Sequence, residues 1–147
     1  MRILRAVAVA AMVAAGTAVG TPVAADVPLP DDVRVVEPAT DVPASLRRFK
    51  GSWAGRWSGK LDTVVIVERV EPSGQADIVY AWGDYAPWSV TRDWERWTAT
   101  IVGDTMTLER FPNGALVRFV FRSDGYLGGT YEMPRYIHHG TFRPGSE

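Results

Sequence analysis

The sequence predicts an all-β domain, an antiparallel up-and-down barrel of about eight short strands. From Gly51 onward apolar and polar residues alternate with a period of two, which is typical of strands that bury one face. Tight turns join these segments, and several contain the Asn-Gly or Asp-Gly pairs that mark hairpins. Consecutive hairpins give an antiparallel meander, and closing the meander removes its exposed edges.

Each expected strand ends in a turn signal. The strands are expected at residues 52–58, 63–70, 76–82, 95–102, 105–111, 115–122, 126–133 and about 139–143. The connection 83–94 is the exception, because it is long, aromatic and irregular. A loop of that length is usually functional or a lid.

The N-terminal residues 1–25 have the features of a signal peptide. Arg2 and Arg5 form a positive start, and the small apolar run that follows is about 14 residues long, short of the roughly 20 that cross a membrane. Val23-Ala24-Ala25 fits the small-x-small cleavage rule. We therefore expect cleavage after Ala25, export to the periplasm or medium, and no integral membrane segment afterwards. An uncleaved anchor is the alternative.

Residues 26–42 are expected to form an extended, proline-rich lead-in to a barrel that spans residues 43–147. Proline fixes φ and removes a backbone donor, so this stretch favours an extended strap. Residues 43–49 can form a short helical turn, which would bury Leu46 and Phe49.

Charge and cysteine content exclude several function classes. The chain has a net charge of −1, and the expected mature part is more negative because the signal peptide carries two arginines and no acid. We therefore expect neither nucleic acid nor an anionic membrane as partner. The absence of cysteine excludes disulfides, thiolate metal sites, a cysteine nucleophile and a lipidated cysteine.

The start of the first strand resembles a known family. Gly51-Ser-Trp53 after a short helical turn is similar to the Gly-x-Trp start of the lipocalin and calycin barrels. In those families an arginine of the final strand packs on that tryptophan, and Arg143, at the end of Gly140-Thr-Phe-Arg143, occupies the corresponding position. The resemblance implies a small bacterial lipocalin-like barrel, closed at one end by Trp53 beneath Arg143.

Alternate strand residues face the barrel interior, and the candidate ligand-binding residues come from this inward set. An aromatic pocket for a small apolar or planar ligand would use Trp57, Tyr80, Trp82, Trp97, Phe119 and Tyr131. The same side chains could instead fill the interior, because a barrel of eight strands is just wide enough for side chains or one small ligand. Gly55 and Gly129 suit either space inside the barrel or bending of the strands.

The long loop supplies a second set of candidates, Tyr85, Trp88 and Trp94. Exposed aromatic residues with acids nearby suit stacking on sugars or contact with an envelope protein. Alternatively, the loop folds over the barrel and buries its own aromatic residues.

The sequence contains no catalytic or metal-binding motif that we recognise. His138 and His139 are adjacent on a strand and point to opposite faces, so they cannot easily share a metal ion. Four carboxylates, Glu68, Asp77, Glu95 and Glu109, are expected to face solvent and to form no catalytic pair.

The expected function is therefore a noncatalytic exported barrel that needs no cofactor and binds a small apolar or aromatic ligand. The alternative is an envelope protein- or glycan-interaction module that acts through the 83–94 loop. An enzyme of unknown type is the third reading.

Overall fold

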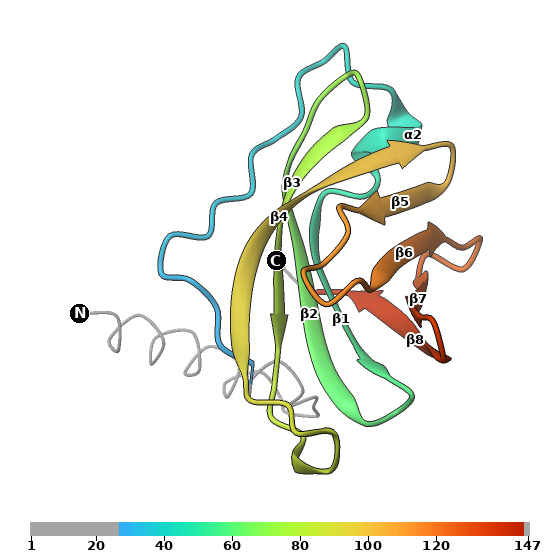
Figure 1. The fold of residues 1–147 in the computed structure, drawn as a ribbon. Helices are drawn as coiled ribbons and strands as arrows, with labels where there is room; N and C mark the ends of the chain where they lie inside the picture. Colours follow the sequence, from blue (N-terminus) through green and yellow to red (C-terminus); the bar gives the residue numbers. More distant parts are fainter. Residues whose placement is uncertain (1–26, 146–147) are drawn as a thin grey trace.

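The computed structural model describes residues 27–145, which contain a closed antiparallel barrel with its strands in chain order (Figure 1). The first and last strands close it, because β1 pairs with both β2 and β8. The predicted fold class is thus confirmed. The expected signal peptide lies outside the described residues. The elements are α2 (Ala44–Arg47), β1 (Gly51–Trp57), β2 (Leu61–Val70), β3 (Gln75–Trp82), η2 (Ala86–Trp88), β4 (Asp93–Val102), β5 (Thr105–Leu108), β6 (Leu116–Phe121), β7 (Leu127–Met133) and β8 (Tyr136–Pro144).

Two strand boundaries differ from the prediction in a way that shapes the interior. β4 begins at Asp93, and β5 ends at Leu108 because the chain turns out of the sheet before Pro112. β5 pairs only with the second half of β4, so residues 93–98 have a strand partner on one side alone. Figure 1 shows the first half of β4 running on beyond β5. The segment 109–115 lies beside β4 there, and the Glu109 amide donates to the Thr98 carbonyl.

The strand β2 is buried on both faces, which explains its continuous β-branched sequence. Val65 and Val67 belong to the interior core. Val64 and Ile66 face outward and pack in a second cluster that includes Val27 of the N-terminal segment. That segment, residues 27–42, forms no strand and runs along the outside of the barrel as a strap (Figure 1). Within the described residues, no helix is long and apolar enough to span a membrane.

One end of the barrel is closed by aromatic packing beneath α2, and we call it the closed end. Phe49 is fully buried, and its carbonyl accepts a hydrogen bond from Trp53 Nε1 at 2.9 Å. Phe121 packs edge-on against both rings, with centroid distances of 5.6 and 5.9 Å. The Arg48 guanidinium lies 4.4 Å from the centre of the Phe121 ring. Trp53 is therefore part of the aromatic packing that closes this end.

The expected pair of Trp53 with Arg143 is not formed. The register of β1 with β8 places Arg143 opposite Ala54, whereas Trp53 lies opposite Pro144. Because side chains alternate along a strand, Phe142 points into the core and Arg143 points to solvent. The cation at this end is Arg48, which comes from the turn after α2 and not from the last strand.

Candidate functional site

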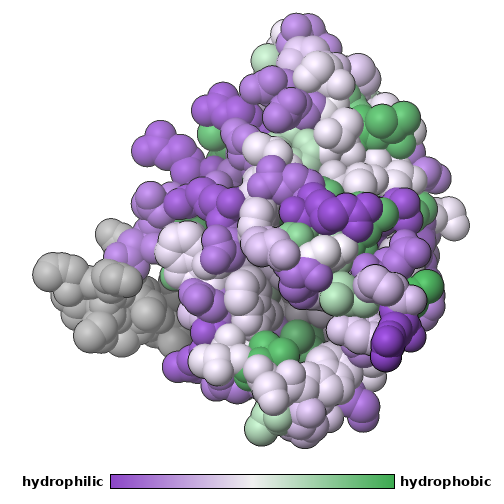
Figure 2. Space-filling view, in the orientation of Figure 1, coloured by the Kyte–Doolittle hydropathy of each residue, from purple (hydrophilic) through white to green (hydrophobic). Residues whose placement is uncertain are grey.

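The barrel interior is packed solid toward the closed end and hollow toward the other end, which we call the open end. Phe119, Met106 and Phe142 are each fully buried in the packed part. The hollow part is a cavity of about 730 Å³. In Figure 2 the surface is hollowed near the lower edge, next to hydrophobic atoms. The lining is mostly aromatic and comprises Trp57, Leu61, Tyr80, Trp82, Trp88, Val90, Glu95, Trp97, Phe111, Pro112, Asn113, Tyr131, Tyr136 and His138.

Trp57 and Tyr80 form the floor of the cavity. Trp57 is 1 % exposed and packs against Phe142 at a ring-centroid distance of 5.1 Å. Its Nε1 donates to the Tyr80 hydroxyl at 2.8 Å. Burial raises the pKa of Tyr80, so this phenol keeps its proton at neutral pH. Among the described residues nothing accepts that proton, which leaves the floor with one donor available to a ligand or water.

The side wall of the cavity between β4 and β6 is formed by the segment 109–115, which lies where β5 does not extend. Phe111 stacks on Trp97, with centroids 5.3 Å apart and an interplanar angle of 15°. Asn113 donates to the Tyr131 hydroxyl at 2.9 Å, so a second phenol also keeps its own proton free to donate. Burial raises the pKa of Tyr131 as well, with smaller opposing and supporting effects from Asn113 and Tyr136. The wall thus combines flat apolar rings with a few oriented polar groups, as small-molecule sites do.

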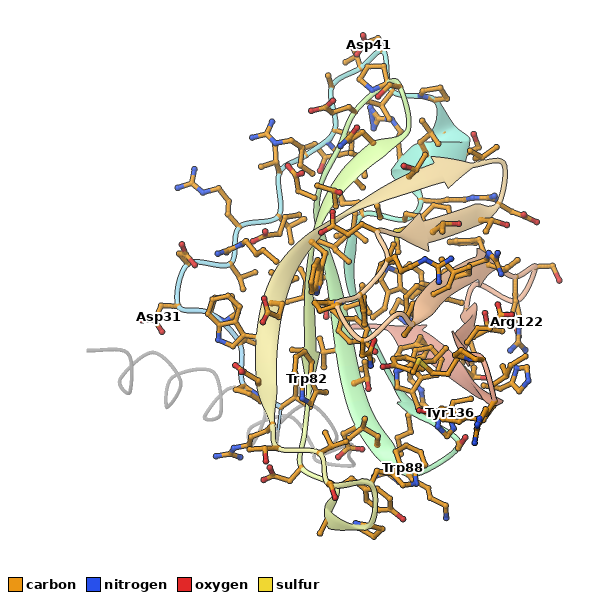
Figure 3. All side chains as sticks on the ribbon, in the orientation of Figure 1. Asp31, Asp41, Trp82, Trp88, Arg122 and Tyr136 are labelled. Carbon is orange, nitrogen blue, oxygen red and sulfur yellow. The ribbon has the colours of Figure 1, made fainter. Side chains whose placement is uncertain are left out.

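The loop 83–92 between β3 and β4 covers part of the open end, and we call it the lid. Trp88 of η2 stacks on His138 of β8, with centroids 4.4 Å apart and an angle of 28°. Tyr85 packs edge-on against Trp88 at 4.9 Å and forms a β-bridge with Val90. Trp82 Nε1 donates to the Thr91 carbonyl at 2.8 Å. Figure 3 shows Trp82, Trp88 and Tyr136 gathered at this end of the barrel.

His138 is the residue of β8 against which Trp88 of the lid packs. Its Nδ1 is 2.8 Å from the Ser58 hydroxyl, and Tyr136 packs against its ring at 4.9 Å. Ser58 does not line the cavity, and no carboxylate of the described residues bonds the other ring nitrogen. The Ser58 contact therefore orients the imidazole against Trp88. Burial lowers the pKa of His138, and His139 lowers it further, so the ring is neutral at pH 7.

We expect the His138 imidazole, followed by NMR, to titrate below its ordinary pKa of about 6.5. A lowered pKa in the folded state means that the unfolded chain binds this proton more readily. The contribution of His138 to the free energy of unfolding should therefore rise with pH between about pH 5 and 7. The same contribution is lost as the pH falls through this range. His138→Gln should flatten this slope in urea titrations, whereas an unchanged slope would contradict the assignment.

Five of the six predicted ligand-binding residues line the cavity, and the sixth lies deeper. The five are Trp57, Tyr80, Trp82, Trp97 and Tyr131. Phe119 shares their inward direction, but it is fully buried on the closed-end side of Trp57. It supports the floor and does not reach the cavity.

The loop candidates separate into two groups. Trp88 lines the cavity, and Tyr85 packs behind it. Trp94 does not belong to this group, because it lies on the outer face of β4 and packs against the cluster under the strap. Strand alternation explains the difference, since Trp94 is one residue out of phase with the inward-facing Glu95.

Glu95 is exposed, as expected, but it also lines the cavity. β4 pairs it directly with the inward-facing Tyr80, and directly paired residues share one face of a sheet. Counting back by two from Trp97 would have found it. Phe111 and Asn113 could not be found in this way, because they leave the sheet.

Within residues 27–145, no group of three or more histidine or acidic side chains is arranged to hold a metal ion. Comparison of the chain with models of protein families, and with curated protein sequences, gives no match. The closed barrel of eight strands is compatible with a lipocalin-like fold.

Proposed function

We propose that this protein is an exported, noncatalytic binding barrel of the lipocalin-like kind, which holds one small, largely aromatic or apolar molecule at its open end. The observation that carries this proposal is the cavity itself, closed below by Trp57 and partly covered by Trp88. Its volume lies in the range of about 300–1,000 Å³ that is usual for small-molecule sites.

The distribution of polar groups supports binding without chemistry. The phenols of Tyr80 and Tyr131 each keep a proton to donate, and both are held in place by a neighbouring side chain. Such groups orient a ligand inside apolar walls. We find no nucleophile, base and orienting acid within hydrogen-bond reach of one another among the described residues, so the proposal contains no reaction.

The contacts of the lid favour this reading over a glycan- or protein-binding loop. Tyr85, Trp88 and Val90 are all packed against the interior core. A platform for sugars needs aromatic faces turned to solvent, whereas Trp88 uses one face to stack on His138.

The test is saturable binding of N-phenyl-1-naphthylamine, an uncharged fluorescent probe of suitable size. We expect one probe per barrel, with quenching of the tryptophans that line the cavity. Val90→Trp places a large ring among the lining residues and should weaken the affinity by about tenfold or more, because overfilling costs about 1–3 kcal/mol.

Val102→Trp is the matched control. Val102 is 73 % exposed and lies at the end of β4 remote from the cavity, so the same substitution should leave probe binding unchanged. Lack of saturable binding by the folded protein, or equal binding by the two variants, would overturn the proposed function.

A further inference from the structure

The side chains that line the cavity carry negative charge and no positive charge at neutral pH. Within the described lining, Glu95 is the one carboxylate, and neither lysine nor arginine is present. His138 is the one lining residue that could carry a positive charge, and burial lowers its pKa, so that the imidazole is neutral at pH 7. A ligand in this cavity therefore meets a single negative charge and aromatic rings.

No described side chain neutralises Glu95. It has no ion pair and no side-chain hydrogen bond within residues 27–145. Its neighbour Arg96 points to the outer face, where it bonds Glu68 at 3.1 Å and Asp32 at 3.0 Å. Arg110, on the segment beside β4, donates instead to the Gly114 carbonyl.

Glu95 is exposed to solvent and lines the cavity, so its charge faces the space that a ligand would occupy. The β3–β4 register sets it beside Tyr80, on the same inward face as Trp97. A neutral ligand would gain no attraction from this charge. An anion would add repulsion, because no lysine or arginine lines the site to offset it.

The aromatic walls favour the opposite charge. Tryptophan and tyrosine rings attract cations through the negative potential of their faces, by about 0.5–2 kcal/mol per contact. Trp82, Trp97 and Tyr131 bring such rings from three strands to the cavity that Glu95 enters. Aromatic rings around one carboxylate suit an organic ammonium ion better than a simple hydrocarbon.

We propose that the ligand of this barrel is an organic cation, an amine or quaternary ammonium group on an apolar or aromatic body, with Glu95 as its counter-ion. This inference rests on the proposed function and adds the charge of the ligand to it. Tyr80 and Tyr131 orient the rest of the molecule through their free hydroxyl protons.

The experiment compares three competitors of similar size and different charge: phenyltrimethylammonium, its uncharged isostere tert-butylbenzene, and benzenesulfonate. Each is titrated against N-phenyl-1-naphthylamine bound to the wild-type barrel, and its affinity is measured from displacement of the probe. We expect the cation to bind about tenfold more tightly than the uncharged isostere, and the anion to bind most weakly.

Glu95→Gln removes the charge with little change in shape, and should weaken binding of the cation by about tenfold, to an affinity similar to that of tert-butylbenzene. Glu71→Gln is the control, because Glu71 is exposed in the β2–β3 turn at the other end of the barrel. Equal affinities for cation and isostere, an unchanged preference in Glu95→Gln, or no displacement by any competitor would overturn the inference. The proposed function fails separately, if the probe itself does not bind.

Discussion

Replacement of Trp57 by alanine is expected to lower the free energy of unfolding by about 3–5 kcal/mol, the range for removing a large buried aromatic side chain. Trp57 is 1 % exposed and lies between the packed and the hollow halves of the barrel. Its ring contacts Phe119, Tyr131 and Phe142. Alanine would join the cavity to a new void and leave the Tyr80 hydroxyl oxygen without its donor.

Urea unfolding followed by circular dichroism measures this loss without relying on tryptophan emission. Trp88→Ala is the matched control, because it removes the same side chain from the half-buried lid. We expect Trp88→Ala to lose much less stability and to weaken probe binding by opening the cavity. Equal losses in the two variants would mean that Trp57 does not hold the two halves together.

The strands could be predicted from the sequence because strand alternation is a local property. A period of two, read from Trp53 to Trp57 or from Tyr80 to Trp82, already gives the inward face. Glycine and proline turns then fix where each strand ends. This rule alone predicts five of the residues that line the cavity.

The remaining features depend on register and on packing between distant segments. Arg143 faces solvent because β1 and β8 pair Ala54, not Trp53, opposite it. Phe111 reaches the cavity because β5 stops short and leaves part of β4 uncovered. Whether the barrel is hollow depends on the total volume of the side chains that all strands point inward at the same height along the barrel. The sequence pattern of a single strand does not predict this total.

The glycines of the first strand have a role that alternation alone does not reveal. Gly55 pairs with Phe142 where β1 meets β8, and a Cβ on Gly55 would lie 2.9 Å from the Phe142 ring and closer still to the Thr141 carbonyl oxygen. A Cβ on Gly140, in β8, would lie about as close to the Arg56 carbonyl oxygen. At Gly55 and Gly140, therefore, the two strands whose seam closes the barrel approach too closely for a side chain.

Gly55→Ala is accordingly expected to cost about 1–3 kcal/mol of unfolding free energy, because the β8 backbone and a buried ring must both move. Gly128→Ala is the control, since it makes the same change within β7 where a Cβ would meet only the flexible Arg122 side chain at 3.5 Å. That variant should stay within about 0.5 kcal/mol of the wild type. Since Gly55 lies within two residues of Trp57, opening the seam should also disturb the cavity floor, and Gly55→Ala should weaken probe binding. A stable Gly55→Ala barrel with unchanged binding would show that the seam tolerates a side chain, and that closure depends on the aromatic core instead.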